Sequence, residues 1–471
     1  MSETLADPSS LLGQLQRGRG AGFLAALSAD PSTVAPLLLA CILNDPRFDE
    51  QCESRADYYA RLAIHVHLPL APLEEYLRSH AGAHPWSYSH LPLDVLGRLT
   101  CRGNDEAAAI LMRYLSYGPR WTEAFEAMVG SDHAPRPVRE LGRVILERFP
   151  DEAALTEEIE GAMLDPRVWD QWAATELRVA PIIVSLRAQA PFVRPTDESI
   201  RAAIDPAWDV SALLSHATHD TAIVFGEAAA ERAGPRDLPV LLDAFFGDDP
   251  DTVRLQVASH ALTILKLPEA LPPLARFVED FDGHEDAPRA QYRIGRVRRI
   301  LAATPEALPI ARAWLSMMGR ARQSVAVSIL KEQSEEADVP LLRALLASAL
   351  DREPESASAA YLVEGCLTAL APFVVQVTYA ELATVFERTR SMWNRRGAAE
   401  LMADVYREAF AGSYAVECLW DCEDDLIEIG CAYADLSMPI VRDRLKHLLH
   451  SPCEGDDVRS HAEKRLQAAA P

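Results

Sequence analysis

Eight arginines lie between residues 289 and 322, where the only acidic residue is Glu306 and lysine is absent. They are Arg289, Arg293, Arg296, Arg298, Arg299, Arg312, Arg320 and Arg322. The segment therefore has a net charge of +7, within a chain whose net charge is −24. Guanidinium groups bind carboxylates and phosphates through paired, charge-assisted hydrogen bonds. The expected chemistry is the binding of an acidic peptide, a phosphorylated segment or a nucleic-acid backbone.

The spacing of these arginines predicts that several of them share one helix face. On a helix that begins near residue 287, an arc of about 120° holds Arg289, Arg293, Arg296 and Arg299. The expected binding residues are these four together with Arg320 and Arg322, which open a later helix. The alternative is that the arginines form ion pairs with Asp and Glu of neighbouring helices.

A second charged segment is acidic and lies near the C-terminal end. Residues 417–428 include Glu417, Asp421, Glu423, Asp424, Asp425 and Glu428. The expected structure is a solvated helix face. The alternative is a surface for a basic partner, including the arginine segment of another copy of the chain.

Cysteine and histidine provide no compact metal-binding pattern. Cys418 and Cys422 are four residues apart, so we expect them to share a helix face. Other candidate ligands are scattered, namely Cys431, His447, His450, Cys453, and the group His216, His219 and Asp220. Zinc sites usually combine close Cys and His pairs, and Cys-x-x-Cys is absent. We therefore predict buried thiols, no bound metal and no cofactor.

Motifs that superficially suggest catalysis have structural explanations. Ser328 and Lys331 have the Ser-x-x-Lys spacing, but the companion motifs of penicillin-recognising enzymes are missing. Gly18, Gly20 and Gly22 resemble a phosphate-binding loop, yet no strand precedes them, so an interhelical turn is expected. No set of nucleophile, base and oxyanion donors is evident, which favours a non-enzymatic function.

The elements that position these residues are predicted from a recurring dipeptide. Leu238-Pro239, Leu271-Pro272, Leu308-Pro309 and Val339-Pro340 are separated by 33, 37 and 31 residues. Proline suits the first turn of a helix, so each dipeptide is expected to open one. Longer second helices are predicted to begin near residues 251, 287, 320, 355 and 394. In the first of them, one apolar stripe is predicted from the spacing of Val253, Val257, Ala261 and Ile264. Because no run alternates in the manner of a strand, the predicted fold is all-α.

Several of the second helices begin with Val-Arg, followed by a small or apolar residue and then Leu. Examples are Val138-Arg139, Val253-Arg254, Val441-Arg442 and Val458-Arg459. This pattern resembles the HEAT repeat, especially its phycobilisome-lyase-like form, most clearly over residues 235–471. The resemblance implies an elongated or arched α-solenoid whose second helices line the concave side, so that the arginines would face one groove. We expect residues 1–230 to form an irregular helical part or cap and residues 231–471 to form the repeats.

Composition narrows the function further. The excess of Ala, Arg, Gly and Pro over Lys is typical of a GC-rich, bacterial-like genome. Eight cysteines without framework spacing, no signal segment at the N-terminus and no long apolar run favour a cytoplasmic protein. We predict a non-enzymatic scaffold or adaptor that holds a protein or peptide on the concave face. Nucleic-acid binding or DNA repair of the glycosylase type is disfavoured by the net charge; chromophore-lyase activity and a defence adaptor are further alternatives.

Overall fold

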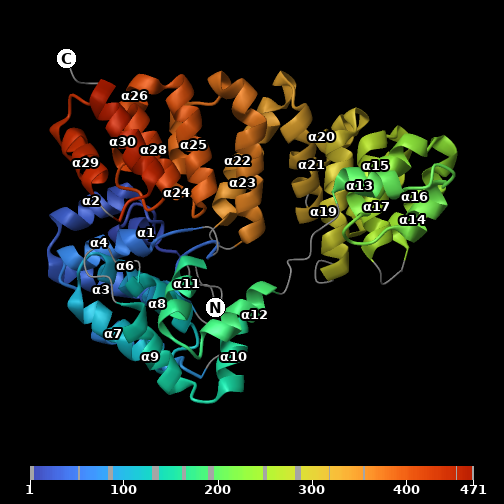
Figure 1. Ribbon diagram of the computed structural model, residues 1–471. Helices are drawn as coiled ribbons and strands as arrows, with labels where there is room; N and C mark the ends of the chain where they lie inside the picture. Colours follow the sequence, from blue (N-terminus) through green and yellow to red (C-terminus); the bar gives the residue numbers. More distant parts are fainter. Residues whose placement is uncertain are drawn as a thin grey trace. The chain divides into compact units, whose positions relative to one another are not determined.

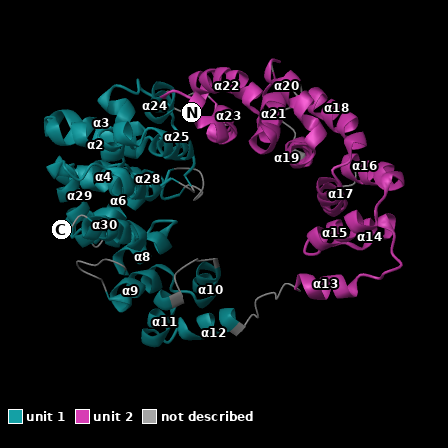
Figure 2. Ribbon diagram, turned by 90° about the horizontal axis from the view of Figure 1, so that it is seen from above, with its two compact units in different colours: residues 1–190, 379–471 teal, residues 191–378 magenta. Residues whose placement is uncertain are grey.

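The computed structural model describes residues 5–50, 53–82, 89–129, 137–161, 166–188, 196–247, 252–281, 288–317, 319–353, 356–451 and 453–468. Every regular element in these ranges is a helix, so the expectation of an all-α protein is confirmed for them (Figure 1). The chain forms two compact units, one of residues 1–190 with 379–471 and one of residues 191–378 (Figure 2). Each unit is described by itself.

Unit 2 (residues 191–378) is a row of helix pairs. Its helices are α13 (Asp197–Ala203), α14 (Val210–His216), α15 (Ala222–Arg232), α16 (Leu238–Phe246), α17 (Thr252–Leu265), α18 (Leu271–Phe281), α19 (Pro288–Ala303), α20 (Leu308–Leu315), α21 (Arg320–Gln333), α22 (Val339–Arg352) and α23 (Ala357–Leu370). Pairs form between α16 and α17, α18 and α19, α20 and α21, and α22 and α23. The second helices of the pairs also pack in sequence, α15 on α17, α17 on α19, α19 on α21 and α21 on α23 (Figure 2).

The dipeptide prediction is confirmed at all four positions. Helices α16, α18, α20 and α22 begin at Leu238, Leu271, Leu308 and Val339, each with proline as the next residue. A short 3₁₀ turn precedes each helix, at Pro235–Asp237, Pro268–Ala270, Pro305–Ala307 and Glu336–Asp338. Proline at the second position lacks an N–H that would have had no partner within the helix, and its fixed φ matches helical geometry.

The apolar faces of these helices make the interior of unit 2. On α17, Val253, Val257 and Ala261 are buried as expected, but Ile264 is 46% exposed. Leu262 is buried in its place, because α17 lies between α15, α16 and α19 and is enclosed on more than one side. The predicted single apolar stripe is therefore wrong at its last member.

Unit 1 combines the two ends of the chain. Its N-terminal helices are α1 (Leu11–Gln16), α2 (Gly20–Ser28), α3 (Pro31–Leu43), α4 (Ala56–His65), α5 (Ala71–Ser79), α6 (Leu91–Cys101), α7 (Asp105–Leu115), α8 (Trp121–Val129), α9 (Val138–Arg148), α10 (Glu152–Gly161), α11 (Pro166–Thr175) and α12 (Ala180–Ala188). Its C-terminal helices are α24 (Tyr379–Arg388), α25 (Met392–Val405), α26 (Arg407–Ala411), α27 (Tyr414–Cys418), α28 (Asp424–Tyr433), α29 (Pro439–His450) and α30 (Asp456–Ala468). Helix α2 packs against α27, so residues about 400 positions apart meet in one interior. The predicted division into an irregular part or cap (residues 1–230) and repeats (residues 231–471) stays a prediction.

One stretch, Ser358–Gln376, is long and apolar enough to cross a membrane by length and composition. It is longer than the apolar runs that the sequence was expected to contain. Half of this stretch is buried inside the protein, as in the core helices of soluble proteins, and Phe373 interrupts its helical geometry.

Candidate functional site

The arginines of α19 divide by exposure. Val297, Ile300 and Leu301 are buried, which places Arg298 and Arg299 on the exposed side of the helix. Arg293 and Arg296 are half-buried. The side chain of Arg289 lies outside the described part of the chain.

Two of these side chains have partners on neighbouring groups that carry no charge. The Arg293 guanidinium donates to the carbonyl of Gly247, the residue that ends α16. Arg296 donates from Nη2 to the Tyr292 hydroxyl at 2.7 Å and lies 5.0 Å from the centre of that ring. Both contacts position the side chains, and neither neutralises their positive charge.

Four polar side chains lie near one another on successive second helices of unit 2 and are called the polar row: Glu227, His260, Arg296 and Arg299. His260 on α17 is close enough to Glu227 of α15 and to Arg296 and Arg299 of α19 for their charges to act on it. Burial lowers the pKa of His260, and the two arginines lower it further. Glu227 is already ion-paired with Arg201. Within the described residues, Arg299 has no hydrogen bond or ion pair and Arg296 has no ion pair, so no carboxylate of this part of the chain neutralises their positive charge.

Arg312 forms ion pairs with acidic residues of the same unit, which was the alternative to a binding role. It lies on α20, and its guanidinium bonds Asp338 (Nε to Oδ1, 2.6 Å) and Glu335. The hydrogen bond to Asp338 and, less strongly, the one to Glu335 raise the pKa of Arg312. Because Asp338 is almost fully buried, this pair links α20 to the turn before α22 and serves the fold.

The remaining two predicted arginines open α21. Arg322 is half-buried, and its Nη1 lies 3.9 Å from the sulfur of Met317. Arg320 is exposed and lines a cavity of about 180 Å³ together with Arg352, Ser356 and Ser358. Among the seven arginines whose side chains are described, the structure therefore separates those that serve packing from those that face outward. The binding role of the predicted set stays a prediction.

The acidic segment near the C-terminus is only in part the solvated helix face that was expected: on α28, Asp424 is exposed and Asp425 and Glu428 are half-buried. Glu417, Asp421 and Glu423 are buried in unit 1. Arg19 from the N-terminal end donates two hydrogen bonds to Glu417, and Arg395 donates one to Asp421 at 3.0 Å. The carboxylates face arginines of the same chain, which is why they can be buried.

The three glycines near residue 20 lie where α1 gives way to α2 and allow this contact: Gly18 is in the interhelical turn, as predicted, whereas Gly20 and Gly22 belong to α2. Gly18 has φ of +67°, and its carbonyl accepts a hydrogen bond from the Cys422 N–H at 3.0 Å. A Cβ on Gly20 would lie 1.9 Å from the carbonyl oxygen of Glu417. The turn therefore has no side chains where the C-terminal segment approaches its backbone.

Charged groups continue into the interior beside this turn. Arg55 and Arg395 are fully buried, and Glu53 accepts from Arg55 at 2.7 Å. Burial raises the pKa of Glu423 to about 8, helped by the nearby carboxylates of Glu53 and Asp421. Its Oε1 accepts a hydrogen bond from the Ser54 N–H at 3.2 Å.

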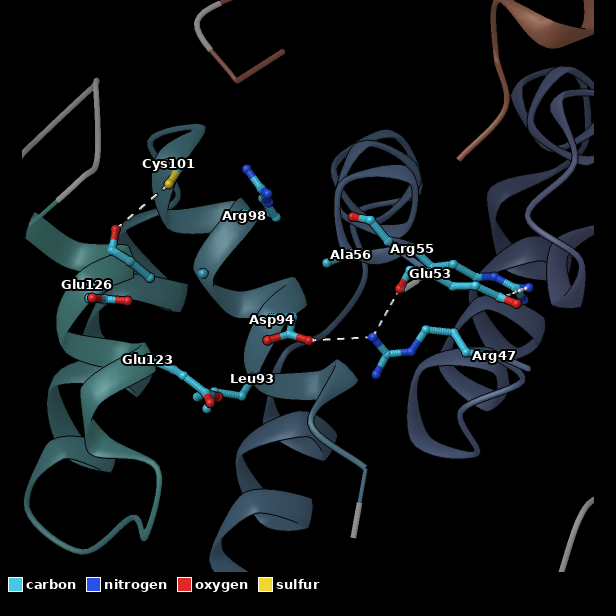
Figure 3. A pocket seen from close by; sticks show the side chains of 13 residues that line it. Arg47, Glu53, Arg55, Ala56, Leu93, Asp94, Arg98, Cys101, Glu123 and Glu126 are labelled. Carbon is cyan, nitrogen blue, oxygen red and sulfur yellow. Dashed lines mark hydrogen bonds and ion pairs between the residues drawn. The ribbon is translucent and has the colours of Figure 1, made fainter. Parts of the chain in front are cut away.

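Two cavities adjoin this charged interior and share Ser54, Arg98 and Cys101 in their walls. The larger, of about 390 Å³, has Arg47 and Arg55 on one side and Asp94, Glu123 and Glu126 on another (Figure 3). Burial raises the pKa of Asp94 to about 6 and that of Glu123 to about 7. Most lining charges are matched within the protein: Arg47 bonds Asp45 and lies 3.9 Å from Asp94, and Glu123 is paired with Arg120.

The second cavity, of about 300 Å³, lies between the two ends of the chain. It is lined by Asp57 and Arg61 of α4, by Asp424 of α28 and by Glu454. Arg61 again pairs with Asp57, at 3.1 Å. The mixture of paired acids and arginines in both cavities fits a buried polar network of the fold.

The cysteines that the structure describes do not gather into a metal centre. Cys418 ends α27 and Cys422 lies in the next turn, so the expected shared helix face is wrong. The helix stops because the chain turns to bring the Cys422 N–H to Gly18. Among the described residues, no three His, Cys, Asp or Glu side chains are grouped so that they could hold a metal ion. Burial raises the pKa of Cys418, Cys422 and Cys431, which keeps these thiols protonated.

Sequence reasoning missed the buried network in unit 1. A signal was present, since Arg19 lies among glycines and the acidic segment of 417–423 is interleaved with apolar residues such as Leu419. No protein-family model matches this chain, and no curated protein matches it in sequence. Any conclusion about the function of this protein therefore rests on the geometry of the described residues.

Proposed function

We propose that the protein is a non-enzymatic binding scaffold and that unit 2 is a HEAT-like α-solenoid. Its second helices form the binding face, and the partner is a protein or peptide with acidic side chains. The observation that carries this proposal is the charge of Arg296 and Arg299, which no carboxylate neutralises within the described residues. A guanidinium that is not paired with a carboxylate retains its capacity for a charge-assisted bond to a partner.

Apolar side chains share this face with the arginines. Ile223 precedes Glu227 by one helical turn on α15 and is 51% exposed. Ile264 follows His260 by one turn on α17 and is 46% exposed. Residues four apart lie on the same side of a helix, so both isoleucines flank the polar row. A surface that combines exposed isoleucine with arginine suits an amphipathic acidic segment, because aliphatic contact adds to the ionic one.

The packing of unit 2 supports the solenoid part of the proposal. In a solenoid each helix pair contacts mainly its neighbours, and the second helices from α15 to α23 pack one on the next in chain order. The net charge of −24 disfavours a nucleic acid as the general partner, since phosphate backbones require a positive surface.

The test is selection of peptides from a displayed library on the intact protein, with binding then measured for the double variant Arg296→Glu/Arg299→Glu. Selected peptides should be rich in Asp and Glu with interspersed apolar residues, and their binding should weaken with salt. The double variant should lose roughly tenfold or more in affinity while keeping its melting temperature. Arg236→Glu/Arg276→Glu is the matched control, because both arginines are exposed on first-helix segments of unit 2.

The proposal fails if the selected peptides bind the double variant as well as the original protein. It also fails if single-stranded DNA or RNA binds more tightly than any peptide and is the ligand that depends on Arg296 and Arg299.

A further inference from the structure

Two cysteines from opposite ends of the chain meet at the wall of the second cavity of unit 1. Cys101 is the last residue of α6, and Cys453 lies in the turn between α29 and α30. The Sγ atom of Cys453 lies 3.8 Å from the carbonyl oxygen of Cys101, and both residues line the cavity of about 300 Å³. Because they are 352 positions apart, only the fold of unit 1 brings them together.

These two cysteines also differ from the others in exposure. Seven of the eight cysteines lie in the described part of the chain, all in the thiol form. Cys101 and Cys453 are partly exposed, whereas five are buried, namely Cys41, Cys366, Cys418, Cys422 and Cys431. Oxidation of a thiol by a small reagent requires access from solution. Among the described cysteines, the two with access to solvent are therefore the two that lie next to each other.

The Cys101 side chain must rotate before the two sulfur atoms can bond. Its Sγ atom lies 3.8 Å from the carbonyl oxygen of Ala127 on α8 (Figure 3). A thiol is a weak hydrogen-bond donor, so this contact yields to a covalent bond. The Cys453 sulfur already lies against the backbone of Cys101, which leaves the Cys101 side chain as the part that must turn.

The turn that carries Cys453 has only long polar contacts at its next residue. Oε1 of Glu454 lies 3.7 Å from Nη2 of Arg444 and 3.9 Å from Nη1 of Arg61. Both distances exceed that of a hydrogen bond, and Glu454 Oε1 accepts none. A disulfide requires Cβ atoms about 3.5–4.5 Å apart. The turn can therefore move toward α6, as this geometry demands, without breaking a hydrogen bond to this atom.

Positive charge near Cys453 marks it as the sulfur that reacts first. Burial raises the pKa of Cys453, Arg102 lowers it, and the smaller effects of Asp57 and Arg98 oppose each other. The thiolate, and not the thiol, is the nucleophile toward a peroxide, and the Arg102 charge stabilises that form. Because burial keeps the thiolate fraction small, oxidation is slow and needs an excess of peroxide.

We propose that Cys101 and Cys453 are a modification site, at which hydrogen peroxide converts the two thiols into a disulfide. The Cys453 thiolate attacks one peroxide oxygen and the O–O bond breaks. A sulfenic acid forms, and the departing hydroxide takes up the thiol proton as water. The Cys101 thiolate then attacks the sulfenic sulfur, the S–O bond breaks and the S–S bond forms. The second hydroxide takes up the Cys101 proton.

In sum of atoms, two thiols are oxidised to one disulfide and one hydrogen peroxide is reduced to two water molecules. The new bond joins an N-terminal helix of unit 1 to the turn between two of its C-terminal helices. This modification does not depend on the binding function proposed above.

The experiment treats the reduced full-length protein with an excess of hydrogen peroxide and blocks the remaining thiols with N-ethylmaleimide. Mass spectrometry of the digest should find the Cys101 peptide joined to the Cys453 peptide, and dithiothreitol should separate them. In Cys101→Ser, Cys453 should instead accumulate a sulfenic acid that dimedone labels. The oxidised protein should melt at a higher temperature than the reduced protein, and Cys453→Ser should abolish this shift. Cys422→Ser is the matched control and should keep the linkage, because Cys422 lines the same cavity but is buried.

Several results would overturn the inference. A disulfide from Cys101 or Cys453 to any other cysteine, Cys52 included, would reject the proposed pair. Recovery of both thiols after peroxide, or sulfinic acid at both without a linkage, would do the same. An unlabelled Cys453 in Cys101→Ser would reject its role as the attacking sulfur. In urea the pair should form no more often than other pairs of the eight cysteines, so an equal yield in urea would show that the fold is not the cause.

Discussion

Arg19 and Glu417 are 398 positions apart in the sequence and are joined by two hydrogen bonds inside unit 1, Nε to Oε1 at 2.8 Å and Nη2 to Oε2 at 3.0 Å. Both side chains are largely withdrawn from solvent. A buried ion pair adds little to stability compared with apolar residues of the same size, but removing one partner leaves an unpaired buried charge. The contact between the two ends of the chain thus depends on both groups being present together.

Arg19→Ala and Glu417→Ala should each lower the free energy of unfolding of unit 1 by about 3–5 kcal/mol. Amide hydrogen exchange should show the loss in α1, α2 and α27. The double variant Arg19→Met/Glu417→Leu should lose less than either single variant. Arg143→Ala, which breaks an exposed ion pair with Glu147 on α9, is the control and should change nothing measurable. Equal small effects for all four variants would contradict the role of the pair.

Gly20→Ala should destabilise unit 1 by about 1–3 kcal/mol or more, because the added Cβ would lie 1.9 Å from the Glu417 carbonyl oxygen. Gly295→Ala in α19 is the opposite control, since nothing lies within 4 Å of its added Cβ. That change should stabilise unit 2 by about 0.5–1 kcal/mol through helix propensity. Urea denaturation followed by circular dichroism measures both. A neutral Gly20→Ala variant would show that the approach of the C-terminal segment is looser than described.

The stability of unit 1 should fall as the pH rises from about 4.5 to about 8. Glu423 has a folded-state pKa raised to about 8, so the folded protein retains a proton that the unfolded chain loses at lower pH. The contribution of Glu423 to the free energy of unfolding is fully present below the pKa of the unfolded state. It is lost as the pH rises through the pKa of the folded state. Glu423→Gln should remove a decline on the order of a few kcal/mol between pH 5 and pH 9. The pKa values of Asp94 and Glu123 are also raised, so the variant should keep a smaller decline of stability with pH. An unchanged decline in Glu423→Gln would contradict the assignment to Glu423.

Arg312 and Arg299 should respond in opposite ways to charge reversal. Arg312→Glu faces the buried Asp338 and should lower the melting temperature of unit 2 by several degrees, because it replaces attraction with repulsion. Arg299→Glu should leave the melting temperature nearly unchanged, since the described residues offer it no ion pair. Differential scanning calorimetry of the two variants decides the point. A matching loss in Arg299→Glu would place that arginine among the structural ones.

Removal of metal ions should leave the protein unaffected. The Cys418 thiol is buried and its pKa is raised by burial, first, and by the charges of Asp421 and Glu417, so it does not supply the thiolate that zinc binds. Elemental analysis of untagged protein should find no stoichiometric zinc, and a chelator should not shift the melting temperature. One zinc ion per chain, lost in Cys418→Ser, would contradict this expectation.

Local features of unit 2 could be predicted from the sequence because they depend on neighbouring residues. The Leu-Pro and Val-Pro dipeptides locate helix starts, since the conformation of proline and its missing N–H act within one turn. Positions such as Val257 and Ala261 follow the helical period and are buried as predicted. Ile264 departs from this pattern because the packing of three neighbouring helices, and not periodicity, decides which side of α17 is covered.

The charged interior of unit 1 could not be predicted in the same way. Asp421 and Arg395 have ordinary surface residue types, and the sequence of either segment alone is compatible with a solvated helix. They are buried only because the turn at Gly18 approaches the segment around Cys422, and no local propensity records that approach. The exposed state of Arg299 and the ion pair of Arg312 likewise depend on which carboxylates the fold brings near.

The assembly of unit 1 from both ends of the chain has a consequence during synthesis. Residues 191–378, which make up unit 2, leave the ribosome after the N-terminal half of unit 1 and before its C-terminal half. At about 5–20 residues per second, this takes on the order of 10–40 s. For that interval Arg19 and Arg55 are without the C-terminal segment that later covers them, and the glycine turn has nothing against its backbone. The last residues translated therefore complete the environment of some of the first, and a chain that stops before Glu417 leaves its own beginning unfinished.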